Sequence, residues 1–431
     1  MKEINISKTN ETLYYKKLDN GLEIYILPNN NQKNFYITFN TRFGSINTEF
    51  KKNDEKTLTK VPNGIAHYLE HLMFNMENGS AFDFFSKLGA SVNAFTTYDF
   101  TCYEVFSSTY FKENLNYLLD YVQTPYFKES LVNNERGIIK EEINMFKSDP
   151  ASELTYGLYR NIFVKDKRNT LISGEVEDIK KITVDNIFDC YNTFYNPSNM
   201  FIIITGKVNP YEAMAIIEEN QSKKDYENVN IINKSFVEPS KANKTYEEKE
   251  MNVELNKINY SLKIPRKNFK KLELSDIELN TYIAIIFNIL YGSTSEIQEK
   301  LINAKIIQNG INVNKTYTKD YIVVSLTTET EYSESLINMI REELDSININ
   351  ENELLRKVKV YKSNYILHFD DIEAVNNNIQ DNIMSYNKFI DNTMDLYDDI
   401  NIKTLNEIVK LLKNRTESIL VIKPKQDKKQ S

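Results

Sequence analysis

The chain has 431 residues, of which about 41% are hydrophobic, and a formal net charge of −8. This is enough apolar material for one large or two ordinary cores. No basic stripe interleaved with aromatic residues occurs, so nucleic acid is not an expected partner. No stretch approaches the roughly 18 apolar residues of a membrane span, and no apolar run follows a basic start, so we expect a cytoplasmic protein without a membrane span. Cys102 and Cys190 cannot make a disulfide framework, and we interpret both as buried thiols.

The first half of the chain begins with two predicted strands, at 22–29 (LEIYILPN) and 34–45 (NFYITFNTRFGS). A helix, a further strand pair, several helices and a last strand follow. The strand pair is SVNAFTTYDFTCYEVFSS, residues 91–108, where alternation predicts one or two antiparallel strands with one covered face. The predicted fold class is therefore α+β, with antiparallel-dominated sheets that carry helices on one face.

The segment GIAHYLEHLMFN, residues 64–75, holds two of the chain's three histidines. We predict a helix here, capped by Asn63. His67 and His71 are four residues apart, so both rings lie on one face and can reach one zinc ion at ~2.0–2.1 Å. Glu70 borders that face and can act as a general base toward an attacking water. The alternative interpretation is a pair of core histidines without a metal.

A catalytic zinc site needs a third protein ligand and an open position. The third histidine, His368, lies in YILHFDD and is interpreted as structural. The candidate is therefore a carboxylate of NNERGIIKEEINMFKSDP, residues 133–150, which reads as a helix. Its buried stripe is predicted to be Ile138, Ile139 and Ile143. Glu135 and Glu142 are seven residues apart and share a face, whereas Glu141 is rotated by about 100°. We choose Glu142 as third ligand and Glu135 as a carboxylate that orients or tunes the site.

The polar, poorly periodic segment 221–250 is predicted to be a linker between a metal-bearing domain, 1–220, and a second domain, 251–431. The two parts resemble each other at offsets of roughly 218 to 222 residues, as an internal duplication would give. In both, a helix-to-strand segment comes last, at 184–206 and 402–424. Shifting the two histidines and Glu70 by about 218 residues leads to Ile285, Asn288 and Ile289, so the second domain is predicted to hold no metal site.

The pair of motifs HYLEH and ERGIIKEE resembles the pitrilysin/insulinase peptidases, a zinc peptidase family that includes mitochondrial processing peptidase. Its H-x-x-E-H order is the inverzincin signature. The resemblance implies that the four matching positions are the zinc ligands and the general base, and that Glu135 is the accessory catalytic glutamate. These four positions are His67, Glu70, His71 and Glu142. GASVNAFTTYDFTCYEV is similar to the family's active-site edge strand, which implies that Asn93 and Ala94 touch the substrate backbone.

The resemblance further implies two homologous domains that form half of a peptidase clamshell, with one Zn²⁺ per chain. The expected function is zinc-dependent hydrolysis of peptides or short unfolded proteins. The family's substrate-holding Arg and Tyr would fall at Ile302 and Asn309 here. This departure favours a heterodimer with a homologous zinc-free subunit that supplies them, over a homodimer. The alternative is a non-catalytic or peptide-binding assembly subunit of the same fold.

Overall fold

The computed structural model describes residues 1–53, 55–227 and 229–425. The chain forms two compact units. Unit 1 consists of Met1–Ile143, Leu171–Ser235 and Tyr365–Thr393, and unit 2 of Asn144–Thr170, Phe236–Asn364 and the chain from Met394 onwards. Each unit thus takes one short segment from the other half of the chain.

Within the described ranges, no helix combines the length and the hydropathy needed to cross a bilayer.

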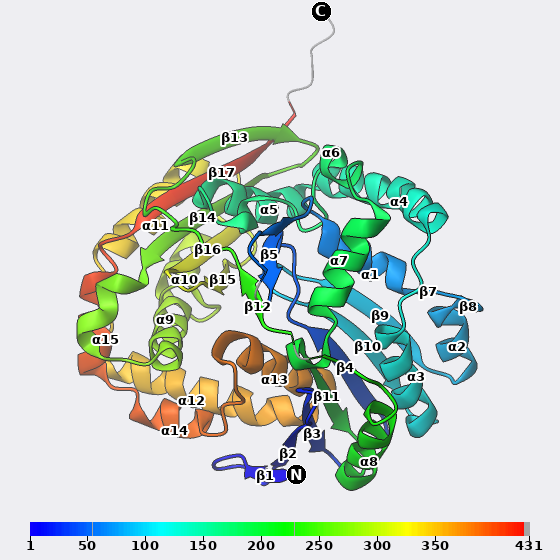
Figure 1. Ribbon diagram of the computed structural model, residues 1–431. Helices are drawn as coiled ribbons and strands as arrows, with labels where there is room; N and C mark the ends of the chain where they lie inside the picture. Colours follow the sequence, from blue (N-terminus) through cyan, green and yellow to red (C-terminus); the bar gives the residue numbers. More distant parts are fainter. Residues whose placement is uncertain (54, 228, 426–431) are drawn as a thin grey trace, which may run out of the picture. The chain divides into compact units, whose positions relative to one another are not determined.

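Unit 1 is built on a sheet with the strand order β1-β2-β3-β11-β4-β10-β9 (Figure 1). Neighbouring strands are antiparallel, except β3 and β11, which are parallel. The strands are β1 Lys2–Asn5, β2 Thr12–Lys17, β3 Glu23–Pro28, β4 Phe35–Thr41, β9 Ser91–Thr96, β10 Thr101–Ser107 and β11 Met200–Gly206. The predicted strands at 22–29 and 34–45 are confirmed as β3 and β4, and 91–108 forms the hairpin of β9 and β10.

Short strands extend this unit beside the main sheet. They are β5 Glu49–Lys52, β6 Thr59–Lys60 and β12 Ile231–Asn233 in one small sheet, and β7 Asn75–Met76 and β8 Gly79–Ser80 in another. The helices of unit 1 are α1 Ile65–Met73, α2 Ala81–Lys87, α3 Phe111–Gln123, most of α4 Glu129–Ser148, α6 Val176–Ile179, α7 Val184–Phe194, α8 Pro210–Gln221 and α13 Ile372–Tyr386, with the 3-10 turns Pro197–Asn199 and His368–Asp370.

The central strands of this sheet are buried on both faces. Along β4, Ile37 and Phe39 point into an apolar core that they share with α1, α3 and α7. Thr38 and Asn40 are also fully buried, on the opposite face, since side chains alternate along a strand. The helices from the first half of the chain therefore cover one face of the sheet, as predicted, and the other face needs polar partners.

Helix α13, from the second half of the chain, supplies those partners. It packs against β11 and β4 (Figure 1). Thr38 Oγ1 donates to Asn376 Oδ1 at 2.8 Å, and Gln380 Nε2 donates to Asn40 Oδ1 at 2.5 Å. The polar face of the sheet is thereby satisfied by a helix that lies more than 300 residues away along the chain.

Unit 2 repeats the arrangement with the strand order β13-β17-β14-β16-β15, again with one parallel pair, β13 and β17. Its strands are β13 Tyr246–Met251, β14 Asn256–Pro265, β15 Asn312–Tyr317, β16 Tyr321–Thr330 and β17 Thr416–Pro424. Its helices are α5 Pro150–Ile162, α9 Asp276–Tyr291, α10 Glu296–Asn303, α11 Ser333–Asp345, most of α12 Glu351–Leu367, most of α14 Thr393–Asp399 and α15 Ile402–Leu411, with the 3-10 turns Lys167–Asn169 and Arg266–Leu272. This order matches β3-β11-β4-β10-β9 of unit 1, so the predicted α+β architecture of two homologous domains is confirmed.

Helix α5 is the counterpart of α13 and packs on β14 and β17 of unit 2. Asn259 Nδ2 donates to Leu154 O at 3.0 Å, and Lys263 Nζ donates to Ile162 O at 3.1 Å. The two helices occupy equivalent places in chain order, so the exchange between the halves is reciprocal.

The segment 221–250, which was expected to be a linker, contains strands. Its residues form β12 and nearly all of β13, and β13 is an edge strand of the unit 2 sheet. The sequence of β13, YEEKEM, has four charged residues in a row, so this edge strand lacks the apolar pattern by which a strand is predicted. The prediction that Cys102 and Cys190 are buried free thiols is confirmed.

The ion pair of Lys263 and Glu238 fixes α5 and the chain after β12 to the unit 2 sheet. The two side chains are 0% and 2% exposed, and their charged atoms are 2.5 Å apart. Lys263→Met leaves the Glu238 carboxylate buried without its cation. We expect a loss of ~3–5 kcal/mol in the free energy of unfolding, measured by chemical denaturation.

The matched control is Lys423→Met, which breaks the pair of Lys423 with Glu248, where both side chains are 41% exposed. Exposed pairs contribute roughly 0–1 kcal/mol. Equal effects of the two substitutions on the free energy of unfolding would contradict the role given to the buried pair.

Candidate metal centre

Helix α1 begins at a glycine with a left-handed backbone conformation. Gly64 is the N-cap, with φ of 83°, and no side chain caps the helix. A Cβ at Gly64 would lie 2.2 Å from Ser173 O, so a larger residue does not fit. The prediction that Asn63 caps the helix is wrong, because Asn63 Nδ2 instead donates to Asp178 Oδ2 at 3.2 Å. The start of α1 is therefore set by contact with the segment 171–182.

The apolar side of α1 lies in the core of unit 1 and leaves its two histidines beside α4. Ile65, Ala66, Leu69 and Leu72 are buried in that core. The hydroxyl of Tyr68 donates to the carbonyl of Val132 on α4. The two helices are thus in direct contact one residue away from His67.

Helix α4 carries the two glutamates that the motif spacing singled out. Ile139 and Ile143 are buried in the core as predicted, but Ile138 is 59% exposed, so its place in the buried stripe is wrong. The apolar stripe is narrower than expected, because α4 packs on the core along one edge only. Glu142 is partly buried, with a side-chain exposure of 23%, whereas Glu141 is 73% exposed.

His67, His71 and Glu142 converge at one point. His67 Nε2 lies 3.5 Å from Glu142 Oε1, and His71 Nε2 lies 3.4 Å from Glu142 Oε2. The three donor atoms are all within 4.8 Å of one another. Two donors on one tetrahedral zinc ion at ~2.0–2.1 Å lie roughly 3.3–3.4 Å apart, so the carboxylate–imidazole spacings fit one shared metal ion.

Glu135 orients His71 from the side opposite to this convergence point. His71 Nδ1 lies 2.8 Å from Glu135 Oε1, which leaves Nε2 directed toward Glu142. Burial alone would lower the pKa of His71, but its bonds with Glu135 and Glu142 and the charge of Glu70 raise it to about 10. Burial would raise the pKa of Glu142, but its bonds with His67 and His71 hold that pKa well below its usual range. The centre therefore holds one proton tightly when no metal is bound.

Glu70 is a buried carboxylate beside the convergence point, with 6% exposure. Thr96 Oγ1 on β9 donates to Glu70 Oε2 at 2.6 Å. Burial raises the pKa of the Glu70 carboxyl, and His67 and Thr96 counter only part of that rise. The sequence placed Thr96 in the edge around Asn93 to Thr96 but did not predict its contact with Glu70, although Thr96 lies two residues after Ala94 on the same strand and so shares its face.

The predicted substrate residues lie on β9, at the end of the strand order of unit 1. Asn93 is exposed, and Ala94 is partly buried against the core. Within the described residues β9 pairs with β10 on one side only, so its second edge is open to another strand. The third histidine, His368, is exposed and stands outside the described metal cluster.

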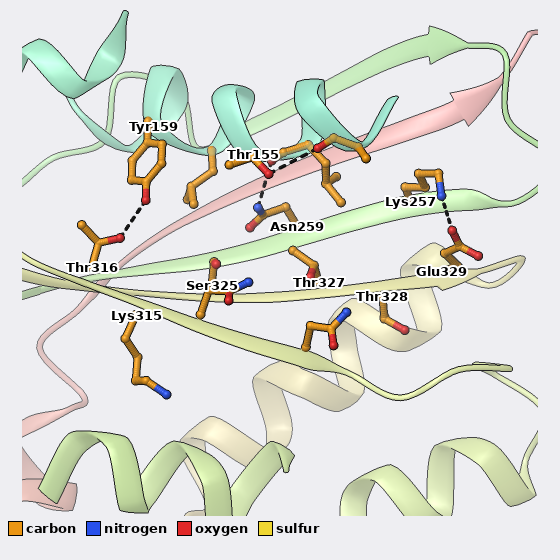
Figure 2. A pocket seen from close by; sticks show the side chains of 15 residues that line it. Thr155, Tyr159, Lys257, Asn259, Lys315, Thr316, Ser325, Thr327, Thr328 and Glu329 are labelled. Carbon is orange, nitrogen blue, oxygen red and sulfur yellow. Dashed lines mark hydrogen bonds and ion pairs between the residues drawn. The ribbon is translucent and has the colours of Figure 1, made fainter. Parts of the chain in front are cut away.

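A separate polar cavity of about 630 Å³ lies in unit 2 between α5 and the strands β14, β15 and β16 (Figure 2). Hydroxyl and amide side chains dominate its lining, and Tyr159 and Thr316 join across it with their hydroxyl oxygens 2.8 Å apart. The carboxylate of Glu329, the one acid among its described lining residues, pairs with Lys257. This cavity offers hydrogen bonds to a ligand, whereas the described cluster of metal-ligating groups lies in unit 1.

Two family models match the chain. The one described as Insulinase (Peptidase family M16) matches residues 59–174, which include the whole His–His–Glu cluster. The one described as Peptidase M16 inactive domain matches residues 181–361.

Individual relatives agree with these matches. The Bacillus subtilis protein named uncharacterized zinc protease YmfH is 34% identical over 367 residues, which cover 84% of this chain and 85% of the relative. The M16-like peptidase of Alicyclobacillus acidocaldarius has the same fold, with a TM-score of 0.90, 24% identity, and coverage of 97% of this chain and 99% of that one. The periplasmic protease PqqL of Escherichia coli has a TM-score of 0.72 at 19% identity, and the match covers 98% of this chain but 48% of PqqL, so the fold of this chain corresponds to half of that longer protease. The chain belongs to the insulinase family of peptidases, family M16.

Proposed function

We propose that this protein is a zinc-dependent endopeptidase in which His67, His71 and Glu142 hold the metal ion. The observation that carries the proposal is the convergence of two imidazole nitrogens and one carboxylate beside the buried carboxylate of Glu70. The donor set of two histidines and one glutamate is typical of catalytic zinc sites that keep an open position. The relatives are named as zinc proteases, which supports the same activity.

In this proposal each protein group has a separate task. A zinc ion at this centre would polarise the scissile carbonyl and lower the pKa of the attacking water. Glu70 acts as general base, taking the proton of that water and passing it to the leaving amine. Thr96 holds one oxygen of Glu70, so the other is available for proton transfer. Glu135 holds His71 in the orientation that directs Nε2 to the metal.

The open edge of β9 is the proposed binding site for the substrate backbone. An extended peptide adds to an exposed strand through main-chain hydrogen bonds, and here Asn93 and Ala94 would contribute them. Backbone pairing does not depend on side chains, so the substrate class is extended peptides or short unfolded proteins. Asn93 and Ala94 both lie in unit 1.

We infer the assembly from the two positions at which the family's substrate-holding Arg and Tyr would fall. Ile302, at the end of α10, is 42% exposed, and Asn309 is also exposed. The family's Arg and Tyr hold the substrate with a guanidinium and a phenol group, and neither Ile302 nor Asn309 has such a group. We infer a zinc-free homologous partner that supplies them, with a homodimer as the alternative, and we keep the expectation of a cytoplasmic location.

A second candidate function is a non-catalytic or peptide-binding subunit of the same fold. The match of residues 181–361 to a domain described as inactive favours it. That match, however, lies outside the cluster at residues 67–142. The two functions differ in whether Glu70 is needed for peptide hydrolysis.

Glu70→Gln removes the base and keeps a side chain of the same size. We expect cleavage of an unfolded peptide library, measured by mass spectrometry with the zinc-loaded chain, to fall by a factor of about 10²–10⁴. The zinc content should stay at one ion per chain, because Glu70 is not a proposed ligand. Undiminished cleavage by the variant would rule out Glu70 as the base. A parent chain that holds zinc and cleaves nothing alone would favour the non-catalytic function or the need for a partner.

Glu142→Gln should remove most of the bound zinc, because a neutral amide oxygen is a much poorer zinc ligand than a carboxylate. The matched control is Glu141→Gln, the adjacent residue with the same chemical change on an exposed side chain. Metal content is measured by elemental analysis after dialysis. Zinc retained in the first variant, or lost in both, would contradict the choice of Glu142.

The high pKa of His71 predicts proton release on metal binding. At pH 8, below its pKa of about 10, the metal-free chain keeps a proton on His71, and His71 must lose it before Nε2 can bind a metal. Zinc affinity should therefore rise with pH up to about 10. Calorimetric zinc titrations at pH 8 in buffers of different ionisation enthalpy should show about one proton released by this residue. Glu135→Gln removes the carboxylate that stabilises the charged ring and should reduce that release; an unchanged proton count would contradict the assignment.

A further inference from the structure

We propose that Arg136 is a positioning residue for the metal centre, because it holds α4 at a fixed place relative to α1 through the segment 171–182. The inference rests on the proposed function, since it takes His67, His71 and Glu142 as the ligands. The guanidinium of Arg136 bonds to Ile179, Ile182 and Asn133, so its effect on the metal would be indirect.

The guanidinium of Arg136 joins α4 to the end of α6. Its Nε donates to Ile179 O at 3.3 Å, and its Nη2 donates to Ile182 O at 3.1 Å. Nη1 donates to Asn133 Oδ1 on the preceding turn of α4 at 3.1 Å. A guanidinium presents its N–H groups in a planar fork and can serve several acceptors at once. The side chains of Ile179 and Ile182 are buried at 0% and 1% exposure, which fixes the two carbonyls.

The same segment holds the start of α1. Gly174 has φ of 72°, and a Cβ there would lie 2.6 Å from Asn63 O. A Cβ at Gly64 would lie 2.2 Å from Ser173 O. Asn63 also donates to Asp178. The backbones at 63–64 and 173–174 are therefore in direct contact, with no side chain between them to absorb a shift.

These contacts connect the two ligand helices through one element. Glu142 lies six residues after Arg136 on α4, about 9 Å along the helix axis. The carboxylate must come within about 3.4 Å of two ring nitrogens on α1, and a small shift of α4 changes both distances together. Tyr68 joins the helices directly through Val132, and His71 does so through Glu135. Arg136 adds a third hold on α4, through the segment that also sets the start of α1.

The test compares Arg136→Met with Lys140→Met, a control one turn along α4 whose side chain is 53% exposed. Zinc affinity is measured by competition with a chelator, and Co²⁺ replaces zinc so that its visible absorption reports the ligand geometry. We expect Arg136→Met to weaken zinc binding about 10- to 100-fold, as for residues that orient metal ligands, and to change the Co²⁺ spectrum. Lys140→Met should match the parent in both. Arg136→Lys keeps the charge without the fork, and we expect it to behave like the Met variant.

Thermal unfolding of the metal-free chains separates positioning from general stability, because a purely structural arginine would lower the unfolding temperature and leave the Co²⁺ spectrum of the folded chain unchanged. Asn63→Ala loosens the α1 side of the same brace and provides a second variant should Arg136→Met fail to fold. Parent-like zinc affinity and spectrum in the folded variants would overturn this inference alone. A parent chain that binds no zinc would overturn the proposed function and this inference together.

Discussion

The candidate centre depends on how closely α1 and α4 approach each other. Two rings on one helix cannot complete a three-ligand site, and the missing donor comes from a helix that begins 58 residues after His71. Tyr68 brings the helices into contact, and the buried side chains of α1 and α4 share one core. Because protein interiors are close-packed, that core resists the small displacements that would separate Glu142 from the two imidazoles. The polar chemistry of the centre thus depends on apolar packing around it.

Burial has opposite consequences for the two kinds of acid in the centre. Glu142 lies against two histidines, whose bonds favour its ionised form over the neutral one. Glu70 is more deeply buried and has one hydroxyl donor, so its neutral form gains. Two carboxylates with environments that push their pKa values apart are suited to different tasks, one as a ligand and one as a group that gains and loses a proton. The sheet contributes to this difference directly, since the donor to Glu70 is Thr96 on β9.

The features that follow from short-range periodicity could be predicted from the sequence. The four-residue spacing of His67 and His71 and the seven-residue spacing of Glu135 and Glu142 determine which side chains share a helical face. The structure brings the donor atoms of three of these four residues within 4.8 Å of one another, and Glu135 contacts His71. Features set by partners distant in the chain could not be predicted. Nothing near Gly64 indicates that Ser173 will exclude a side chain there.

Contacts with distant parts of the chain also explain the larger differences between the predictions and the structure. Ile138 belongs to an apolar pattern but faces solvent, because only contact with the core decides how wide a buried stripe is. Helices α5 and α13 look like ordinary members of their own halves. Their exchange between units is evident only from the hydrogen bonds that they make in the structure. Thr38 of the unit 1 sheet bonds to α13, and Lys263 of the unit 2 sheet bonds to the end of α5. The strand β13 was not predicted, because its charged residues give no apolar alternation.

Unit 2 has the same fold as unit 1, but no cluster like that of His67, His71 and Glu142 is found among its described residues. In chain order α9 and α12 take the places of α1 and α4, and the positions that the duplication pairs with His67 and His71 hold Ile285 and Ile289, both buried. Asn288 stands where Glu70 would be, and its side-chain oxygen accepts from Lys357 of α12 at 2.6 Å. A helix-to-helix polar contact therefore persists at this place with an amide and an ammonium group. Since the same architecture forms around it, the fold does not need a metal to join these helices. The histidines and glutamates of unit 1 are then best explained by chemistry, because the packing that they interrupt is satisfied in unit 2 by isoleucine.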